Sequence, residues 1–245
     1  MKTLNCIMVL AHLIGVPLMH SEDEHWWSRK PLTEPLVPVT DGWGRNEVDF
    51  FILHKLKAKN LEPSETASPR VLIRRLTFDL TGLPPSLNEI KTFEEEYASD
   101  PVSAYEELVD RLLASPRHGE RFARHWLDVA KYADTCGYDK DKLRPNAWPY
   151  RDYVIRSFNN DKPYDQFIKE QIAGDILYPD IEDGILALGF LAAGPWDFIG
   201  HVEVSESKMD GKVARNLDRD DMVSNVFNSF CATTIQCARC HEHKG

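Results

Sequence analysis

Hydrophobic residues recur every three to four positions along most of the chain after residue 45, which is the spacing of amphipathic helices. In NEVDFFILHKLKAKN, residues 46–60, the apolar positions include Phe51, Ile52 and Leu56. The segment opens with an asparagine, a preferred N-cap, and ends in lysines, which interact favourably with the C-terminal end of a helix dipole. It predicts one amphipathic helix.

Residues 68–86 carry a second helix with clear start and stop signals. Ser68 is placed as N-cap and Pro69 as the first helical residue, while Gly82 and the prolines after it end the pattern. Two capping boxes follow, Ser86 with Glu89 and Ser103 with Glu106. They predict helices near 87–97 and 104–114.

The helical pattern continues to the C-terminus. After Pro116, apolar residues share one face of a further helix, and more helical stretches are expected at 149–159, 163–174, 183–194 and about 218–235. No alternating strand run and no glycine-rich phosphate loop interrupts them. We therefore expect a mainly α, multi-helix globular domain over residues 46–245. Residues 22–45 should form an extended N-terminal arm, and 133–152 and 195–221 long polar loops.

The first 21 residues are typical of a secretory signal peptide. Lys2 precedes an apolar run from Leu4 to Met19, and the chain then turns abruptly polar. The run is short for a membrane span, so we expect export to the periplasm or the extracellular space, with no stable membrane span after signal removal. A buried N-terminal helix or an uncleaved anchor is the alternative.

Composition excludes some partners. The formal net charge is −10 over 245 residues, which opposes binding to phosphate backbones and anionic lipids. No nucleic-acid partner is expected. With 42% hydrophobic residues the chain has ample material for a buried core.

The chain ends on CARCHEHKG, where Cys237, Cys240 and His241 have the spacing of a c-type haem attachment site. In such sites two thiols add across the haem vinyl groups and the adjacent imidazole becomes the proximal iron ligand. The predicted export agrees, since covalent haem attachment takes place outside the cytoplasm. The distal ligand is left open among Met209, Met222, His201 and sequence beyond Gly245.

Two other interpretations of the cysteines stay open. Cys237, Cys240 and His241, with His243, could hold Zn²⁺ in a structural or binding module, although a typical zinc site joins two ligand pairs. Cys237 and Cys240 could also form a reversible disulfide. Farther upstream, Cys136 is either a buried thiol or half of a disulfide with Cys231, and Cys6 lies in the predicted signal peptide.

The loop at 133–152 suggests a third function class. Its carboxylates Asp134, Asp139 and Asp141 could serve a hydrolytic or glycan-handling domain as acid and base. The ligand spacing of a Ca²⁺-binding loop is missing. A solvated or salt-bridged loop is the simpler explanation.

Several longer blocks of sequence carry a family resemblance. They are WWSRKPL, NEVDFFILHKL, LIRRLTFDLTGLPPS, YEELVDRLLASPRHGERFARHWLDVAKYADT, RPNAWPYRDYVIRSFNNDKPYDQFIKEQIAGD, GPWD, LDRDDMV and CARCHEHK. Together they resemble the planctomycete-specific cytochrome-type domain, a family of unknown function found in large exported proteins. The resemblance implies a helical, exported domain with Cys237, Cys240 and His241 at its motif, and His243 as a companion without an assigned role.

The sequence therefore predicts an exported c-type-cytochrome-like domain that binds haem c and transfers electrons. The resemblance also implies that the domain is C-terminally incomplete at residue 245. A redox partner protein or a C-terminal partner domain would receive the electrons, and the sequence identifies neither.

Overall fold

A computed structural model describes residues 30–39, 42–138 and 140–242, and divides the chain into two compact units, Met1–Thr66 and Ala67–Gly245. The predicted signal peptide at 1–21 lies outside the described residues. In the first unit, residues 30–39 form no helix or strand and are mostly exposed, as expected for an extended arm. Helix α2 (Glu47–Lys57) follows, with the Asn46 side chain accepting a hydrogen bond from Asp49 N. The predicted asparagine cap is confirmed.

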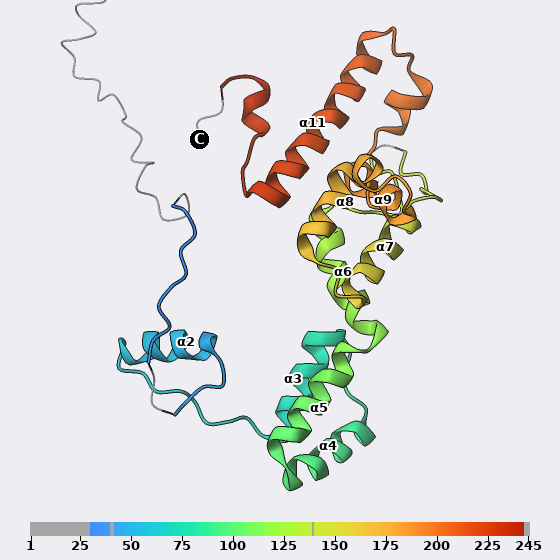
Figure 1. The fold of residues 1–245 in the computed structure, drawn as a ribbon. Coiled ribbons are helices and arrows are strands. Elements are labelled where there is room, and N and C mark those ends of the chain that lie inside the picture. Colours follow the sequence, from blue (N-terminus) through green and yellow to red (C-terminus); the bar gives the residue numbers. More distant parts are fainter. Residues whose placement is uncertain (1–29, 40–41, 139, 243–245) are drawn as a thin grey trace, which may run out of the picture. The chain divides into compact units, whose positions relative to one another are not determined.

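The second unit begins with three helices around a small core (Figure 1). These are α3 (Pro69–Thr81), α4 (Leu87–Ser99) and α5 (Pro101–Leu113). Their buried residues form one cluster, which consists of Ile73, Phe93, Ala104, Leu108 and Leu112. Helix α3 ends at Gly82 in the left-handed conformation, with φ of 73°. Ser86 and Glu89 form the predicted capping box at the start of α4.

The second predicted capping box is wrong. Helix α5 begins three residues earlier than expected, because the Asp100 carboxylate accepts hydrogen bonds from Val102 N and Ser103 N. Pro101 then occupies the first helical position, where its missing N–H costs nothing. Ser103 lies inside the helix, and its hydroxyl donates to Glu107 Oε1 at 3.0 Å.

A larger core follows in α6 (Pro116–Val129), α7 (Trp148–Asn159), α8 (Tyr164–Leu177), α9 (Glu182–Leu186) and α10 (Gly189–Ala192). Trp126 of α6 packs edge-on against Phe167, with ring centroids 4.9 Å apart. Its Nε1–H is shared between Gln171 Oε1 at 2.8 Å and Tyr150 Oη at 3.1 Å. The polar atoms inside this core therefore satisfy one another.

Helices α8 and α9 approach unusually closely. A Cβ added at Gly174 would lie 2.1 Å from the carbonyl oxygen of Gly184, and one added at Gly184 would lie 2.7 Å from the carbonyl oxygen of Gly174. Only glycine on both sides permits this contact.

The last long helix is longer than predicted. Helix α11 spans Met209–Cys231, and a π-helical turn, η3 (Ile199–Glu203), precedes it, so much of the expected polar loop at 195–221 is helical. Tertiary contacts explain the difference. Arg215 Nη1 donates to the carbonyls of Gly200 and Gly211, and its Nη2 donates to that of His201. This one side chain ties η3 to the first turns of α11.

The prediction of a mainly α, multi-helix fold is confirmed. Across the described residues there is no β-strand, only a single antiparallel bridge between Thr135 and Leu143 in the loop before α7. None of the helices in the described part of the chain is long and apolar enough to span a membrane.

Candidate functional site

The cysteine motif begins on the short 3₁₀ turn η4 (Gln236–Arg239), which follows α11; Cys240 caps the turn and His241 comes directly after it. The Cys237 carbonyl accepts hydrogen bonds from Cys240 N at 3.2 Å and from His241 N at 3.3 Å. Residues three apart on such a turn lie on the same side. Both thiols are exposed, and neither is part of a disulfide. The turn therefore presents two free thiols on one side.

The ring of His241 has a defined hydrogen bond. Its Nδ1 lies 2.8 Å from the backbone oxygen of Glu242. A carbonyl oxygen can only accept, so Nδ1 carries the proton in this contact. In the neutral ring Nε2 then keeps its lone pair, and the hydrogen bond at Nδ1 is the usual way in which a protein orients a metal-binding imidazole.

The turn contacts one side of α11. Arg239 Nη1 lies 3.2 Å from Asp220 Oδ2, and both side chains are partly exposed. Such a pair contributes little free energy, and it identifies the face of α11 beside which the turn lies. No group of three or more metal-ligating side chains occurs within the described ranges. His243, the fourth candidate zinc ligand, lies outside them.

The candidate distal ligands do not converge on this turn. His201 Nδ1 lies 2.8 Å from the Asp197 carbonyl oxygen and Nε2 lies 2.7 Å from Asp218 Oδ2, so both ring nitrogens are engaged. Met209 begins α11, about 16 Å along the helix axis from Asp220. Met222 lines a cavity on another face of the helix. No residue of this set is placed to act as the distal ligand of the motif.

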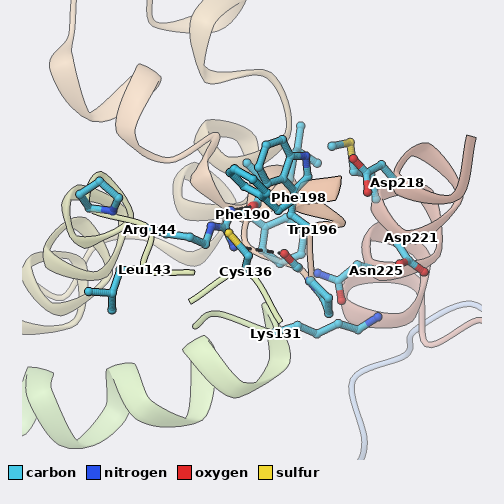
Figure 2. A pocket seen from close by; sticks show the side chains of 16 residues that line it. Lys131, Cys136, Leu143, Arg144, Phe190, Trp196, Phe198, Asp218, Asp221 and Asn225 are labelled. Carbon is cyan, nitrogen blue, oxygen red and sulfur yellow. Dashed lines mark hydrogen bonds between the residues drawn. The ribbon is translucent and has the colours of Figure 1, made fainter. Parts of the chain in front are cut away.

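That cavity has a volume of about 420 Å³ (Figure 2). Its walls come from the loop before α7, the segment around Trp196, and α11. Most of the wall is apolar, including Phe190, Trp196 and Phe198, while Asp218, Asp221 and Asn225 of α11 supply polar groups. Cys136 also lines it as a buried, free thiol, which decides between the two alternatives for this cysteine.

His201 and Asp218 form a polar pair beside the cavity. The Trp196 ring lies against His201, with centroids 4.9 Å apart. Burial raises the pKa of the Asp218 carboxyl, and repulsion from Asp221 and Asp197 raises it further. Attraction to His201 lowers this pKa, but the raising effects are together the stronger ones. Because Nδ1 donates to a carbonyl, the contact at Nε2 needs one proton held between His201 and Asp218.

The acidic loop gives its carboxylates local structural partners instead of a shared site. Asp134 accepts a hydrogen bond from the Tyr132 hydroxyl at 2.7 Å, and Asp141 accepts one from Gly137 N at 2.9 Å. Hydrogen bonds from Thr135 and Gly137 lower the pKa of Asp141. Asp139 lies outside the described residues. The contacts of Asp134 and Asp141 are those of a folded loop.

The residues of the cavity were missed by the sequence analysis. Asp221, Met222 and Asn225 lie three, four and seven positions after Asp218, which places all four on one face of a helix. That signal lies within the helix expected at about 218–235. It does not reveal a cavity by itself, because the other walls come from residues far from α11 in the sequence.

Comparison with known proteins gives one match. The family model described as "Protein of unknown function (DUF1549)" matches residues 47–245, from α2 to the end of the chain. The searches of curated proteins and of solved structures return no match. Since the family model covers most of the chain, including the cysteine motif and every residue of the cavity, the protein belongs to the DUF1549 family.

Proposed function

We propose that Cys237 and Cys240 attach haem covalently, that His241 is its proximal ligand, and that the domain carries electrons. The observation that supports this most is the pair of free, exposed thiols on η4, followed at once by an imidazole whose Nδ1–H is bonded to a backbone carbonyl. This leaves Nε2 as the ligand atom. When bound, haem supplies one-electron exchange at its iron.

The residues fit the chemistry of attachment. Each thiol adds across one vinyl group: a carbon–sulfur bond forms, the thiol hydrogen goes to the neighbouring carbon, and no oxidant is consumed. This requires two reduced, accessible cysteines at the spacing of the motif, which Cys237 and Cys240 provide. Arg239, which lies between the two cysteines, contacts Asp220 of α11.

Export and partner choice are part of the same proposal. The predicted signal peptide at 1–21 would deliver the chain to the compartment where haem is attached. An electron-transfer partner would approach the exposed turn at η4. Because the net charge of the chain is −10, a neutral or basic surface is the favourable one on such a partner.

The test is covalent haem staining of the full chain, produced with its own N-terminus in a bacterial host that has cytochrome c maturation machinery. We expect a stained band on a denaturing gel and its loss in Cys237→Ser/Cys240→Ser. Cys231→Ser is the matched control, because Cys231 is also free and exposed but lies outside the motif. It should stain normally.

A second variant separates attachment from ligation. His241→Ala keeps both thiols, so the band should remain stained while the absorption spectrum changes to that of iron without its proximal histidine. A folded, exported chain that does not stain would overturn the proposal. Stoichiometric zinc in that chain, lost in the double cysteine variant, would instead establish the zinc alternative at Cys237, Cys240 and His241.

A further inference from the structure

The cavity beside α11 lies on a different face of that helix from the cysteine turn. Successive helical residues are about 100° apart, so Asp220, which contacts Arg239, lies nearly opposite Asp218 and Asn225, which line the cavity. A ligand in the cavity would therefore not compete with a group bound at η4. The cavity calls for an explanation of its own.

Several polar groups of the cavity wall are already committed. Arg144 donates to the backbone oxygens of Ala192, Ala193 and Gly194, which fixes its guanidinium to the wall. Asp218 is paired with His201. These contacts shape the cavity and leave little hydrogen-bonding capacity for a ligand.

Asn225 is different, because it is a buried polar side chain without a partner. Only 7% of the residue is exposed, and no hydrogen bond of its amide is present among the described residues. Figure 2 shows the amide directed into the cavity beside Lys131. Because the amide faces the cavity, its donor and its acceptor are both available to a ligand there.

The three remaining polar side chains of the cavity wall differ in whether they donate or accept hydrogen bonds. Asn225 both donates and accepts, Asp221 only accepts, and Lys131 only donates. Neither Asp221 nor Lys131 has an ion pair within the part of the chain that the structure describes. One carboxylate and one ammonium leave no net charge for a ligand to neutralise. Hydroxyl groups, which donate and accept, match this set better than an anion or a cation does.

The remaining wall is apolar and aromatic. Trp196 and Phe190 face the same space as the polar groups of α11. A volume of about 420 Å³ falls within the range of small-molecule sites, which combine apolar walls with a few placed polar groups. The carbon–hydrogen faces of a sugar ring pack well on such walls, while its hydroxyls reach the polar side.

We propose that this cavity binds a neutral, polyhydroxylated ring, such as one sugar residue of a glycan, with hydroxyls on Asn225 and Asp221 and its apolar face on the Trp196 wall. The acidic loop contributes to the wall of this site, but its carboxylates Asp134 and Asp141 do not line the cavity and have local partners. The site is independent of haem attachment at η4.

The experiment is an NMR titration of the ¹⁵N-labelled full chain with methyl glucoside, galactoside and mannoside. The indole N–H of Trp196, assigned with Trp196→Phe, reports on the cavity. Two charged versions of the same ring, methyl glucosaminide and methyl glucuronide, test whether neutrality matters. We expect saturable binding of at least one neutral glycoside at millimolar concentration and weaker binding of both charged forms.

Two variants on the same helix test the assignment. Asn225→Ala should weaken binding about tenfold or more, because the ligand loses a buried partner. Asn216→Ala makes the same change at an exposed position of α11 outside the cavity and should leave binding unchanged. If Asn225→Ala does not fold, Asp221→Ala, at an exposed position, should weaken binding severalfold. No binding of any neutral glycoside, preference for a charged one, or binding that the cavity variants leave unchanged would each overturn the proposal.

Discussion

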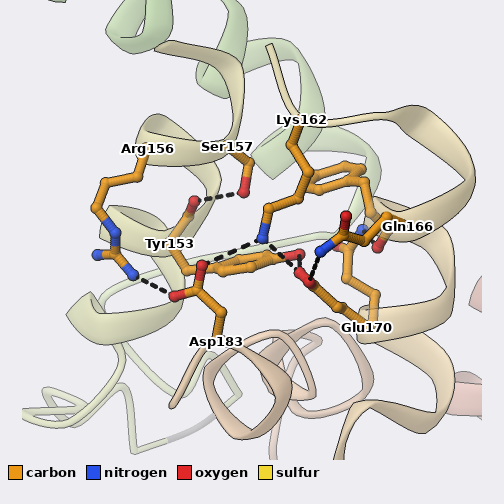
Figure 3. Close-up of polar contacts among 9 residues, drawn as sticks. Tyr153, Arg156, Ser157, Lys162, Gln166, Glu170 and Asp183 are labelled. Carbon is orange, nitrogen blue, oxygen red and sulfur yellow. Dashed lines mark hydrogen bonds and ion pairs between the residues drawn. The ribbon is translucent and has the colours of Figure 1, made fainter. Parts of the chain in front are cut away.

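Lys162 Nζ lies 2.5 Å from Glu170 Oε2, and only 1% of the Glu170 side chain is exposed (Figure 3). The same carboxylate accepts hydrogen bonds from the Tyr153 hydroxyl at 2.8 Å and from Gln166 Nε2 at 2.7 Å. Lys162 also reaches Asp183 Oδ2 at 3.1 Å. A buried carboxylate is tolerated here because its oxygens have partners on several sides.

Removing Lys162 should therefore destabilise the fold strongly. Lys162→Met leaves the Glu170 charge buried without its ammonium partner, and we expect a loss of about 3 kcal/mol in the free energy of unfolding, measured with urea. Lys169→Met is the matched control on α8, since Lys169 pairs with Asp165 where both side chains are more than half exposed. It should cost less than about 1 kcal/mol. Equal losses in the two variants would contradict the structural role of the buried pair.

The same cluster predicts a pH dependence. Burial alone would raise the pKa of Asp183, but the hydrogen bonds and charges of Arg156 and Lys162 outweigh it and lower that pKa. A carboxyl with a lowered folded-state pKa stabilises the fold above its unfolded pKa, near 3.9, and this contribution is lost as the pH falls through the folded value. The difference in stability between the wild-type chain and Asp183→Asn should therefore shrink below about pH 4.

Urea unfolding at a series of pH values from neutral to acidic checks this. Asp180→Asn, at an exposed position three residues earlier, should differ from the wild-type chain by a small and constant amount. A wild-type to Asp183→Asn difference that does not change on acidification would refute the assignment.

The contact between α8 and α9 predicts a large effect of one methyl group. Gly174→Ala places a Cβ 2.1 Å from the Gly184 carbonyl oxygen, so the helices must separate, and we expect destabilisation of about 2 kcal/mol or more. Gly194→Ala is the control, because a Cβ there meets nothing within 4 Å. Thermal unfolding of both variants measures the contrast. A Gly174→Ala chain as stable as Gly194→Ala would show that the two helices are not in this close contact.

The start of α5 can be tested by two substitutions. Asp100→Ala removes the side chain that caps Val102 N and Ser103 N, and should cost about 1 kcal/mol of stability. Ser103→Ala should cost little, because Ser103 is inside the helix and bonds only to the exposed Glu107. A larger loss of stability in Ser103→Ala than in Asp100→Ala, measured by urea unfolding, would instead support the capping box predicted from sequence.

Local rules predicted the fold class and many helix ends. The Asn46 cap, the Ser86 and Glu89 box and the Gly82 stop depend on residues within one turn of each other, so they are readable without tertiary structure. The box at Ser103 failed because two adjacent caps competed and Asp100, followed by a proline, is the better one. The motif Cys237, Cys240 and His241 was likewise local, and so was readable from spacing alone.

Tertiary structure decided the rest. The sequence by itself determined a helical chain with two thiols and an imidazole at one turn, because helix periodicity, caps and motif spacing are all short-range. Only the three-dimensional contacts extended α11 to Met209, since Arg215 binds carbonyls of η3 that no local pattern connects to it. The same contacts brought Trp196 and Asn225 to one cavity, where the Asn225 amide has no hydrogen-bond partner among the described residues, because burial and pairing depend on residues far apart along the chain.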